Sequence, residues 1–133
     1  MGNMIARIDH IGIAVQNITD ALQFFQDALG MKLERVDLEE GGRTQVAFLP
    51  VGSSDVELVE SQDADSGLAK FLAKRGEGIH HICFEVDDID AALARLKELQ
   101  CLTNVLNGNA DVIYPCYHKT LSATEDIESI EQN

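Results

Sequence analysis

The sequence contains no tryptophan, and aromatic residues make up only 5% of its 133 positions. It has two prolines, and no apolar run approaches the ~20 residues that a membrane helix needs. We therefore expect a mainly aliphatic core and no membrane partner. The apolar fraction of 45% is typical of a folded globular protein and argues against disorder.

Positive charge is also scarce. Ten lysines and arginines stand against 23 aspartates and glutamates, which gives a net charge of −13. Such a charge repels phosphate backbones, and no local basic patch is visible in the sequence. The composition therefore argues against a nucleic-acid partner.

The sequence has few cysteines, and their spacing does not indicate a disulfide or metal-binding motif. Cys83, Cys101 and Cys116 are odd in number and form no CxxC motif. This usage is typical of reduced thiols rather than of a disulfide framework. The first residues resemble neither a signal peptide nor a transit sequence, so we expect a cytoplasmic protein or the mature form of a matrix protein.

The chain consists of two successive patterns of strands and helices. The first predicts a strand, a helix and three further strands, at 8–15, 19–29, 32–38, 44–49 and 55–60. Thr19 is the expected N-cap of the first helix, and Gly30 its end. A linking helix is predicted at Ser66–Arg75, closed by Gly76.

The pattern restarts at Ile79, with a strand at 79–86 and a helix at 89–99. Asp111–Tyr114 is a further short strand, which Pro115 should restrict to a sheet edge or a bulge.

An internal repeat relates the two halves. At a fixed offset of 71 residues, seven pairs are identical, among them His10 with His81 and Val15 with Val86. We therefore predict an α+β fold in a single domain, 1–133. Two tandem βαβββ modules, at about 5–61 and 78–133, should form curved sheets around a metal-binding cleft.

Potential metal ligands fall on repeated positions. The offset aligns His10 with His81 and Glu57 with Glu128, so their side chains should converge on one cleft. Two imidazoles and two carboxylates suit a divalent ion such as Co²⁺, Mn²⁺, Zn²⁺ or Ni²⁺. By strand alternation His80 should point to the opposite face. Cys83 is expected to face away from His81 as a buried small apolar residue.

Two segments carry a resemblance to a known family. Ile8–Val15, followed by an amphipathic helix, and Gly76–Ile89, with its Gly-Ile-His-His-Ile core, closely resemble the methylmalonyl-CoA epimerase family of the vicinal oxygen chelate superfamily. The resemblance covers residues 5–99. After Gln100 the chain departs from it, because the family's Gly-rich loop and Gly-Gly turn are absent.

The resemblance implies a set of site residues. His10, His81 and Glu57 take three ligand positions, and the fourth falls to Glu128, with Glu131 as the alternative. Some members place a catalytic glutamate on the strand before the third ligand, where this chain has Gln45. An amide cannot remove a proton from carbon, so its role would have to be taken by another carboxylate, for which Glu128 is the candidate, or by a water.

The implied activity is metal-dependent epimerisation of methylmalonyl-CoA through an enolate, by a homodimer. Two alternatives stay open, namely a glyoxalase-type isomerase and a non-catalytic binding domain with an incomplete metal site. The acyl-CoA substrate is anionic, so local cations would have to attract it. The candidates are Arg43, Lys70, Lys74, Arg75 and Lys119.

Overall fold

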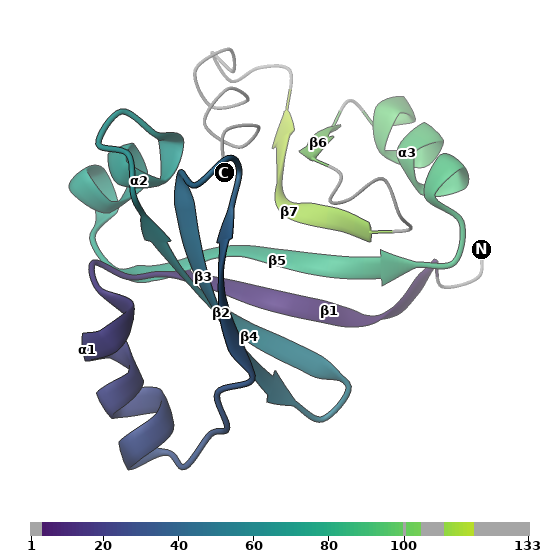
Figure 1. Cartoon of the computed structure of the whole chain (residues 1–133). Helices are drawn as coiled ribbons and strands as arrows, with labels where there is room; N and C mark the ends of the chain where they lie inside the picture. The colour runs from purple at the N-terminus through teal and green to yellow at the C-terminus, as the bar shows by residue number, and fades with distance from the viewer. Residues whose placement is uncertain (1–3, 100, 105–110, 119–133) are drawn as a thin grey trace.

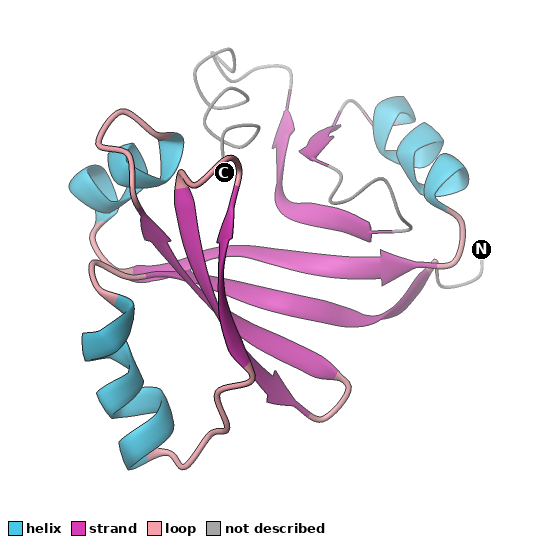
Figure 2. Ribbon diagram, viewed as in Figure 1, coloured by secondary structure: helices cyan, strands magenta, loops and turns pink. Residues whose placement is uncertain are grey.

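The computed structural model describes residues 4–99, 101–104 and 111–118, and side chains are placed for 4–99. Its central element is one seven-stranded sheet in the order β2-β3-β4-β1-β5-β7-β6. The sheet is strongly curved, with helices at its outer parts (Figures 1 and 2). The bounds of the strands are β1 Ile5–Ala14, β2 Arg35–Glu39, β3 Thr44–Val51, β4 Ser54–Ser61, β5 Gly78–Val86, β6 Cys101–Asn104 and β7 Asp111–His118.

The first helix differs from its prediction. α1 (Ile18–Leu22) begins after Asn17, whose side-chain oxygen accepts a hydrogen bond from the Asp20 amide at 2.9 Å. The prediction of Thr19 as N-cap was therefore wrong, because the asparagine two residues earlier already satisfies the free amide. The helix widens into a π-helix, η1 (Gln23–Ala28).

The other two helices begin and end close to the residues that the sequence predicted. α2 (Gly67–Arg75) is capped by Ser66, which accepts from the Ala69 amide at 3.0 Å, and ends at Gly76 with φ of +76°. α3 spans Ile89–Glu98. Within the described residues, no helix has the length and apolar character to cross a membrane.

The helices cover opposite faces of the first half of the sheet. On one face Leu68 and Leu72 of α2 pack against Val46 and Val59. On the other, α1 and η1 pack against a second group of strand residues, made up of Ala47, Leu49, Leu58 and Val56. In the first half of the sheet, α1 therefore covers one face, and α2 covers part of the opposite face.

The two halves meet at β1 and β5, which pair antiparallel in the middle of the sheet. In the first half β4 runs parallel to β1, whereas in the second half β7 runs antiparallel to β5. The predicted α+β class is confirmed. Over the described residues, however, the second half does not reproduce the strand order of the first.

Pro115 falls in β7, between β5 and β6 in the sheet. Pairing with β5 stops at Tyr114, and the β6–β7 ladder shifts register between Leu102 and Asn104. β7 is thus not an edge strand, and the irregular pairing around Pro115 confirms the alternative of a bulge.

Candidate functional site

The site centres on two histidines at the β1–β5 seam. His10 Nε2 lies 3.0 Å from His81 Nε2, and the two rings are nearly perpendicular. His10 is buried, with 1% of its surface exposed. The structure therefore brings together the pair that the internal repeat singled out.

The backbone of β1 makes room for this pair. Gly12 is directly opposite His81 in the ladder, and the imidazole of His81 lies over it. A Cβ atom at position 12 would come within 2.6 Å of both ring nitrogens, which is closer than real Cβ contacts. Glycine is therefore required here for close approach rather than for backbone freedom.

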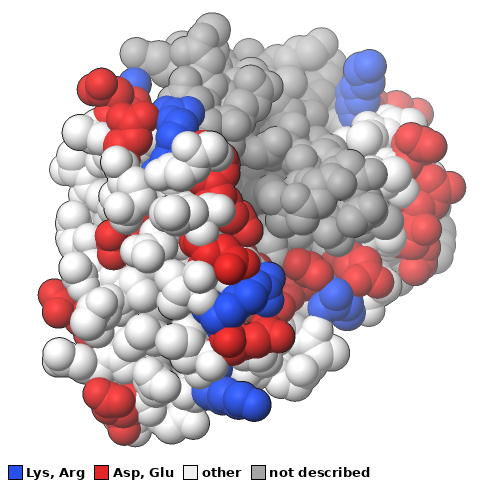
Figure 3. Space-filling model, viewed as in Figure 1, with Lys and Arg blue, Asp and Glu red and all other residues white. Residues whose placement is uncertain are grey.

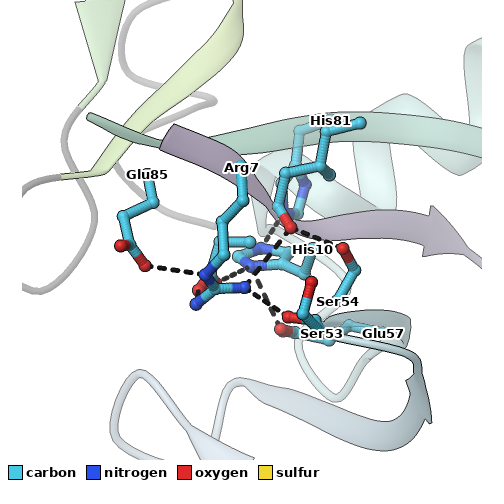
Figure 4. Close-up of polar contacts among 9 residues, drawn as sticks. Arg7, His10, Ser53, Ser54, Glu57, His81 and Glu85 are labelled. Atoms are coloured by element: carbon cyan, nitrogen blue, oxygen red, sulfur yellow. Dashed lines mark hydrogen bonds and ion pairs between the residues drawn. The ribbon is translucent and has the colours of Figure 1, made fainter. Parts of the chain in front are cut away.

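Glu57 is the third member of the site. β4 pairs Glu57 with Gly12, which places the carboxylate on the same sheet face as His10. Its Oε2 lies 3.1 Å from Nδ1 of His10, so His10 stands between Glu57 and His81 (Figure 4). Burial, and then the nearby carboxylates led by Glu39, raise the pKa of Glu57 to about 8.

Two β-bulges interrupt the ladder at the site. Between Ile8 and His10 the register leaves Asp9 as an extra residue on β1, and between Gly12 and Ile13 it leaves His80 as an extra residue on β5. A bulge re-aims the side chain of the residue it contains. Asp9 Oδ2 lies 2.8 Å from His10 Nδ1, and His80 Nδ1 lies 2.9 Å from His81 Nδ1.

The expectation that His80 points away from His81 is thus wrong, because strand alternation fails at a bulge. Burial lowers the pKa of His80 to about 4. Burial, together with the neighbouring imidazoles, lowers the pKa of His81 to about 3. Both rings are therefore neutral at pH 7, which is the form that a metal ligand needs.

Cys83 also departs from its expected orientation. It is opposite His10 in the ladder, and its thiol belongs to a group with Asp9 and His10 whose ligand atoms lie within 4.8 Å of one another. Residues two apart on a strand share a face, so Cys83 faces the same side as His81. The residue is fully buried, as expected.

Gln45 lies on the other face of the sheet. β3 pairs Gln45 with Glu60, whereas it pairs Phe48 with Glu57. Glu60 accepts a hydrogen bond from the amide of Ile18 in α1, so this is the face that α1 covers. The register therefore separates Gln45 from His10 and Glu57, which is against its assignment to the altered base position.

Sequence reasoning missed Glu40, in the turn between β2 and β3. Its carboxylate accepts a hydrogen bond at 3.3 Å from Thr44, and Val46, the residue two further along β3, packs under α2 on the site face. Burial raises the pKa of Glu40 to about 7. Glu40 also has a φ of +54°, unusual for a side-chain-bearing residue. A half-buried carboxyl group in a turn gives no signal in the sequence.

Glu128 and Glu131, the alternative fourth ligands, lie outside the described residues, as does Lys119. The strand beside β5 over Ile82–Glu85 is β7. Its counterpart in the first half, beside β1, is β4, which carries Glu57.

The donor set fits a divalent metal ion. Two nitrogens 3.0 Å apart match neighbouring ligands of one ion at ~2.1 Å each, and they equally match a hydrogen bond. Glu57 supplies a carboxylate on the same face. His10 and His81 are therefore the described residues that the structure brings together to hold such an ion, whereas Glu57 contacts the other ring nitrogen of His10 and its place as the third ligand stays a prediction.

Comparison with known proteins gives the family. Residues 9–101 match the Glyoxalase/Bleomycin resistance protein/Dioxygenase superfamily. The chain is 40% identical over 96 residues to human mitochondrial methylmalonyl-CoA epimerase, covering 71% of this chain but 54% of the human one. It is 38% identical to the ethylmalonyl-CoA/methylmalonyl-CoA epimerase of Cereibacter sphaeroides, with 71% of this chain and 72% of that protein covered.

Solved structures agree. A Streptomyces coelicolor methylmalonyl-CoA epimerase variant in complex with 2-nitronate-propionyl-CoA superposes with a TM-score of 0.68 at 32% identity, over 74% of this chain and 73% of that one. The Mycobacterium tuberculosis methylmalonyl-CoA epimerase gives 0.72 at 27% identity, over 88% and 82%.

Proposed function

Because the chain belongs to the methylmalonyl-CoA epimerase family of the Glyoxalase/Bleomycin resistance protein/Dioxygenase superfamily, we propose that it interconverts the 2R and 2S forms of methylmalonyl-CoA. The observation that carries this proposal is the pair of facing imidazoles beside a largely buried carboxylate, on the strands matched to the family. The chain spans about half the length of the human relative. The proposed activity therefore concerns the site in this chain, and not the functions of the whole human protein.

The reaction requires removal of the hydrogen at C2, between a thioester and a carboxylate, and its return on the opposite face. A divalent ion, when bound by His10, His81 and Glu57, supplies Lewis-acid stabilisation of the negative charge that develops on the substrate oxygens. Co²⁺, Mn²⁺, Zn²⁺ and Ni²⁺ all suit two imidazoles and a carboxylate.

Glu40 is the described residue best suited to move the C2 proton. A general base works best when its pKa lies near the working pH, and the pKa of Glu40 is raised to about 7. Thr44 holds the carboxylate by its hydrogen bond. A second group must act on the opposite face of the substrate, and Glu128 stays our prediction for it.

The substrate's CoA group carries phosphates, which the acidic surface would repel. Figure 3 shows acidic side chains spread over the visible face and only a few basic ones. Of the cations considered, Arg43 is paired with Asp63 at 2.9 Å. Lys70, Lys74 and Arg75 of α2 form no ion pair with any described residue.

The end of α2 is close to the histidines. The Arg75 guanidinium lies 5.8 Å from the centre of the Phe71 ring, and that ring contacts His80 at a centroid distance of 4.8 Å. We assign phosphate attraction to Lys70, Lys74 and Arg75, because they form no ion pair with a described carboxylate and belong to the helix whose Phe71 contacts His80.

The decisive experiment follows deuterium exchange at C2 of methylmalonyl-CoA in D₂O, together with the metal content of the purified protein. Exchange with a stoichiometric divalent ion, both lost in His81→Ala, supports the proposal. Bound metal without exchange would indicate a glyoxalase-type or other substrate. Neither metal nor exchange under metal-replete conditions would indicate a non-catalytic binding domain. The mass in solution tests the proposed homodimer.

A further inference from the structure

One row of residues crosses the sheet from its outer edge to the histidines. Arg35 of β2 is opposite Phe48 of β3, which is opposite Glu57 of β4. Glu57 is opposite Gly12 of β1, which is opposite His81 of β5. Residues that are opposite each other in a ladder project from the same face of the sheet. Arg35 is therefore on the face that carries Glu57 and His81.

The side chain of Arg35 is held in place on this face. Its guanidinium carbon lies over the Phe48 ring, 3.8 Å from the ring centre, and Phe48 is itself buried in the cluster that α2 covers. Nε donates a hydrogen bond to Asp37 at 2.7 Å, and Nη1 donates to Glu34 at 3.2 Å. An arginine that is already ordered in this way loses little further freedom when it binds a ligand.

The guanidinium of Arg35 still has donors to offer. Within the described part of the chain its third nitrogen, Nη2, has no hydrogen-bond partner. The side chain is 49% exposed, so a ligand can reach it. The pair with Glu34 is exposed on both sides, and such pairs contribute little to stability, so Nη1 can also turn toward a ligand. Two neighbouring guanidinium nitrogens match the two oxygens of a carboxylate.

Arg7, the other arginine near the histidines, is fully engaged (Figure 4). Its Nε donates to Glu85, its Nη2 to Asp9, and its Nη1 to the carbonyl of Ser53. Of these two arginines, Arg35 is therefore the one with a nitrogen left for a ligand.

The charge around Glu57 is otherwise negative. The carboxylates of Glu39, Asp55 and Asp9 add to the rise that burial gives the pKa of Glu57, whereas the positive charge of Arg35 opposes that rise. The acyl group of the proposed substrate carries a carboxylate of its own, which the acidic groups would repel. Arg35 supplies the opposite charge on the same face.

We propose that Arg35 is a specificity-determining residue that binds the free carboxylate of the acyl group, and so favours acyl-CoA esters that carry a carboxylate over those that do not. The proposal rests on the proposed function, because it concerns the substrate of the same site. Arg35 binds and orients the substrate and takes no part in the movement of the C2 proton.

The test compares two ligands that differ by this carboxylate. Methylmalonyl-CoA and propionyl-CoA share the CoA group, and calorimetric titration of the metal-replete full chain gives the affinity for each. In Arg35→Gln we expect the affinity for methylmalonyl-CoA to fall about 10- to 100-fold, the usual effect of losing a hydrogen bond between charged groups. The affinity for propionyl-CoA should stay unchanged. An equal fall for both ligands would overturn the proposal.

A ligand without phosphates separates the acyl carboxylate from the phosphates of CoA. Methylmalonyl-pantetheine keeps the acyl group and the thioester but has no phosphate. Arg35→Gln should weaken its binding by the same factor as the binding of methylmalonyl-CoA. A loss confined to the CoA ester would assign Arg35 to the phosphates and refute its role in reading the acyl group.

Two further variants separate recognition from packing and from general charge. Arg35→Lys keeps the charge without the planar fork and should recover part of the lost affinity; if Arg35→Gln does not fold, Arg35→Lys decides by the same comparison of ligands. Lys32→Gln removes one positive charge three residues earlier, and Lys32 forms no ion pair with any described residue. This control should bind both CoA esters as the wild type does. A loss there equal to that in Arg35→Gln contradicts a specific role of Arg35.

The two proposals fail differently. A wild type that prefers methylmalonyl-CoA through Arg35 but shows no C2 exchange would refute the proposed epimerisation alone. C2 exchange together with a ligand preference that Arg35→Gln leaves unchanged would refute the role of Arg35 alone. A wild type that binds neither CoA ester would refute both.

Discussion

The imidazole of His81 lies directly over Gly12, its partner across the β1–β5 ladder. The close approach places His81 beside His10 and leaves no space for a side chain at position 12. The glycine is therefore a determinant of the site, although it can bind nothing itself.

Gly12→Ala should displace the His81 ring. We expect a loss of metal affinity of about 10- to 100-fold, the usual effect of disturbing a ligand's support, and a destabilisation of about 1–3 kcal/mol from overpacking. Metal titration and urea unfolding measure the two effects. Gly78→Ala is the matched control, because a Cβ at Gly78 meets no atom of the described residues within 4 Å. Equal losses of metal affinity in Gly12→Ala and Gly78→Ala would contradict the role of Gly12 in placing His81.

Glu40→Gln should abolish most of the C2 exchange, by about 100-fold or more, since general-base catalysis contributes 10²–10⁴-fold. Wild-type exchange should rise with pH through about 7, as the carboxyl of raised pKa loses its proton. Gln45→Ala, on the opposite face, should keep wild-type exchange. Loss of exchange in Gln45→Ala, with exchange kept in Glu40→Gln, would instead place the base position at Gln45 on β3.

The same carboxyl group predicts a pH-dependent stability. Its pKa is raised from 4.5 to about 7 in the folded state, so the folded protein binds a proton that the unfolded chain releases. The stabilisation is complete below pH 4.5 and is lost as the pH rises through 7. Thermal unfolding of Glu40→Gln should therefore show a smaller decline between pH 4.5 and 8 than wild type. Parallel declines would contradict this.

Metal binding should release a proton from Glu57. The pKa of its carboxyl is raised to about 8, so it is mostly protonated at pH 7, and a ligand carboxylate must be deprotonated. Calorimetric titration in buffers of different ionisation enthalpy should give about one proton released near pH 7 and fewer above pH 9. Glu57→Gln should remove this pH dependence and weaken binding.

Lysines of α2 should attract the substrate without taking part in proton transfer. We expect Lys70→Ala and Lys74→Ala to raise KM for the acyl-CoA by roughly 3- to 10-fold each, with kcat unchanged. The effect should shrink with added salt, because exposed charges are screened. Lys97→Ala on α3 is the control, because Lys97 likewise forms no ion pair with any described residue. A matching rise in KM there would point to a general charge effect.

Local patterns in the sequence were sufficient for much of the fold. The caps of α2, Ser66 and Gly76, are short-range signals, and the strand-like run at 79–86 predicted β5 nearly to its ends. The pairing of His10 with His81 followed from the repeat, because duplicated modules place equivalent residues alike.

The features that could not be predicted from the sequence depend on pairing between strands that are distant along the chain. The bulges at Asp9 and His80 arise only when β1 meets β5, so strand alternation misplaced His80. Gln45 and Glu57 were separated by the β3–β4 register, and a shift of one residue would have reversed that outcome. The role of Glu40 depends on burial in a turn, which has no periodic pattern.

The antiparallel joining of β1 and β5 has a consequence for the origin of the site. Each half of the chain supplies one histidine, and neither half holds both. Two identical strands paired antiparallel are related by a two-fold axis. A protein consisting of the first module alone could therefore assemble a pair of facing histidines only by placing its β1 against β1 of a second copy. Fusion into one chain allows the equivalent positions to diverge, as Asp9 and His80 have.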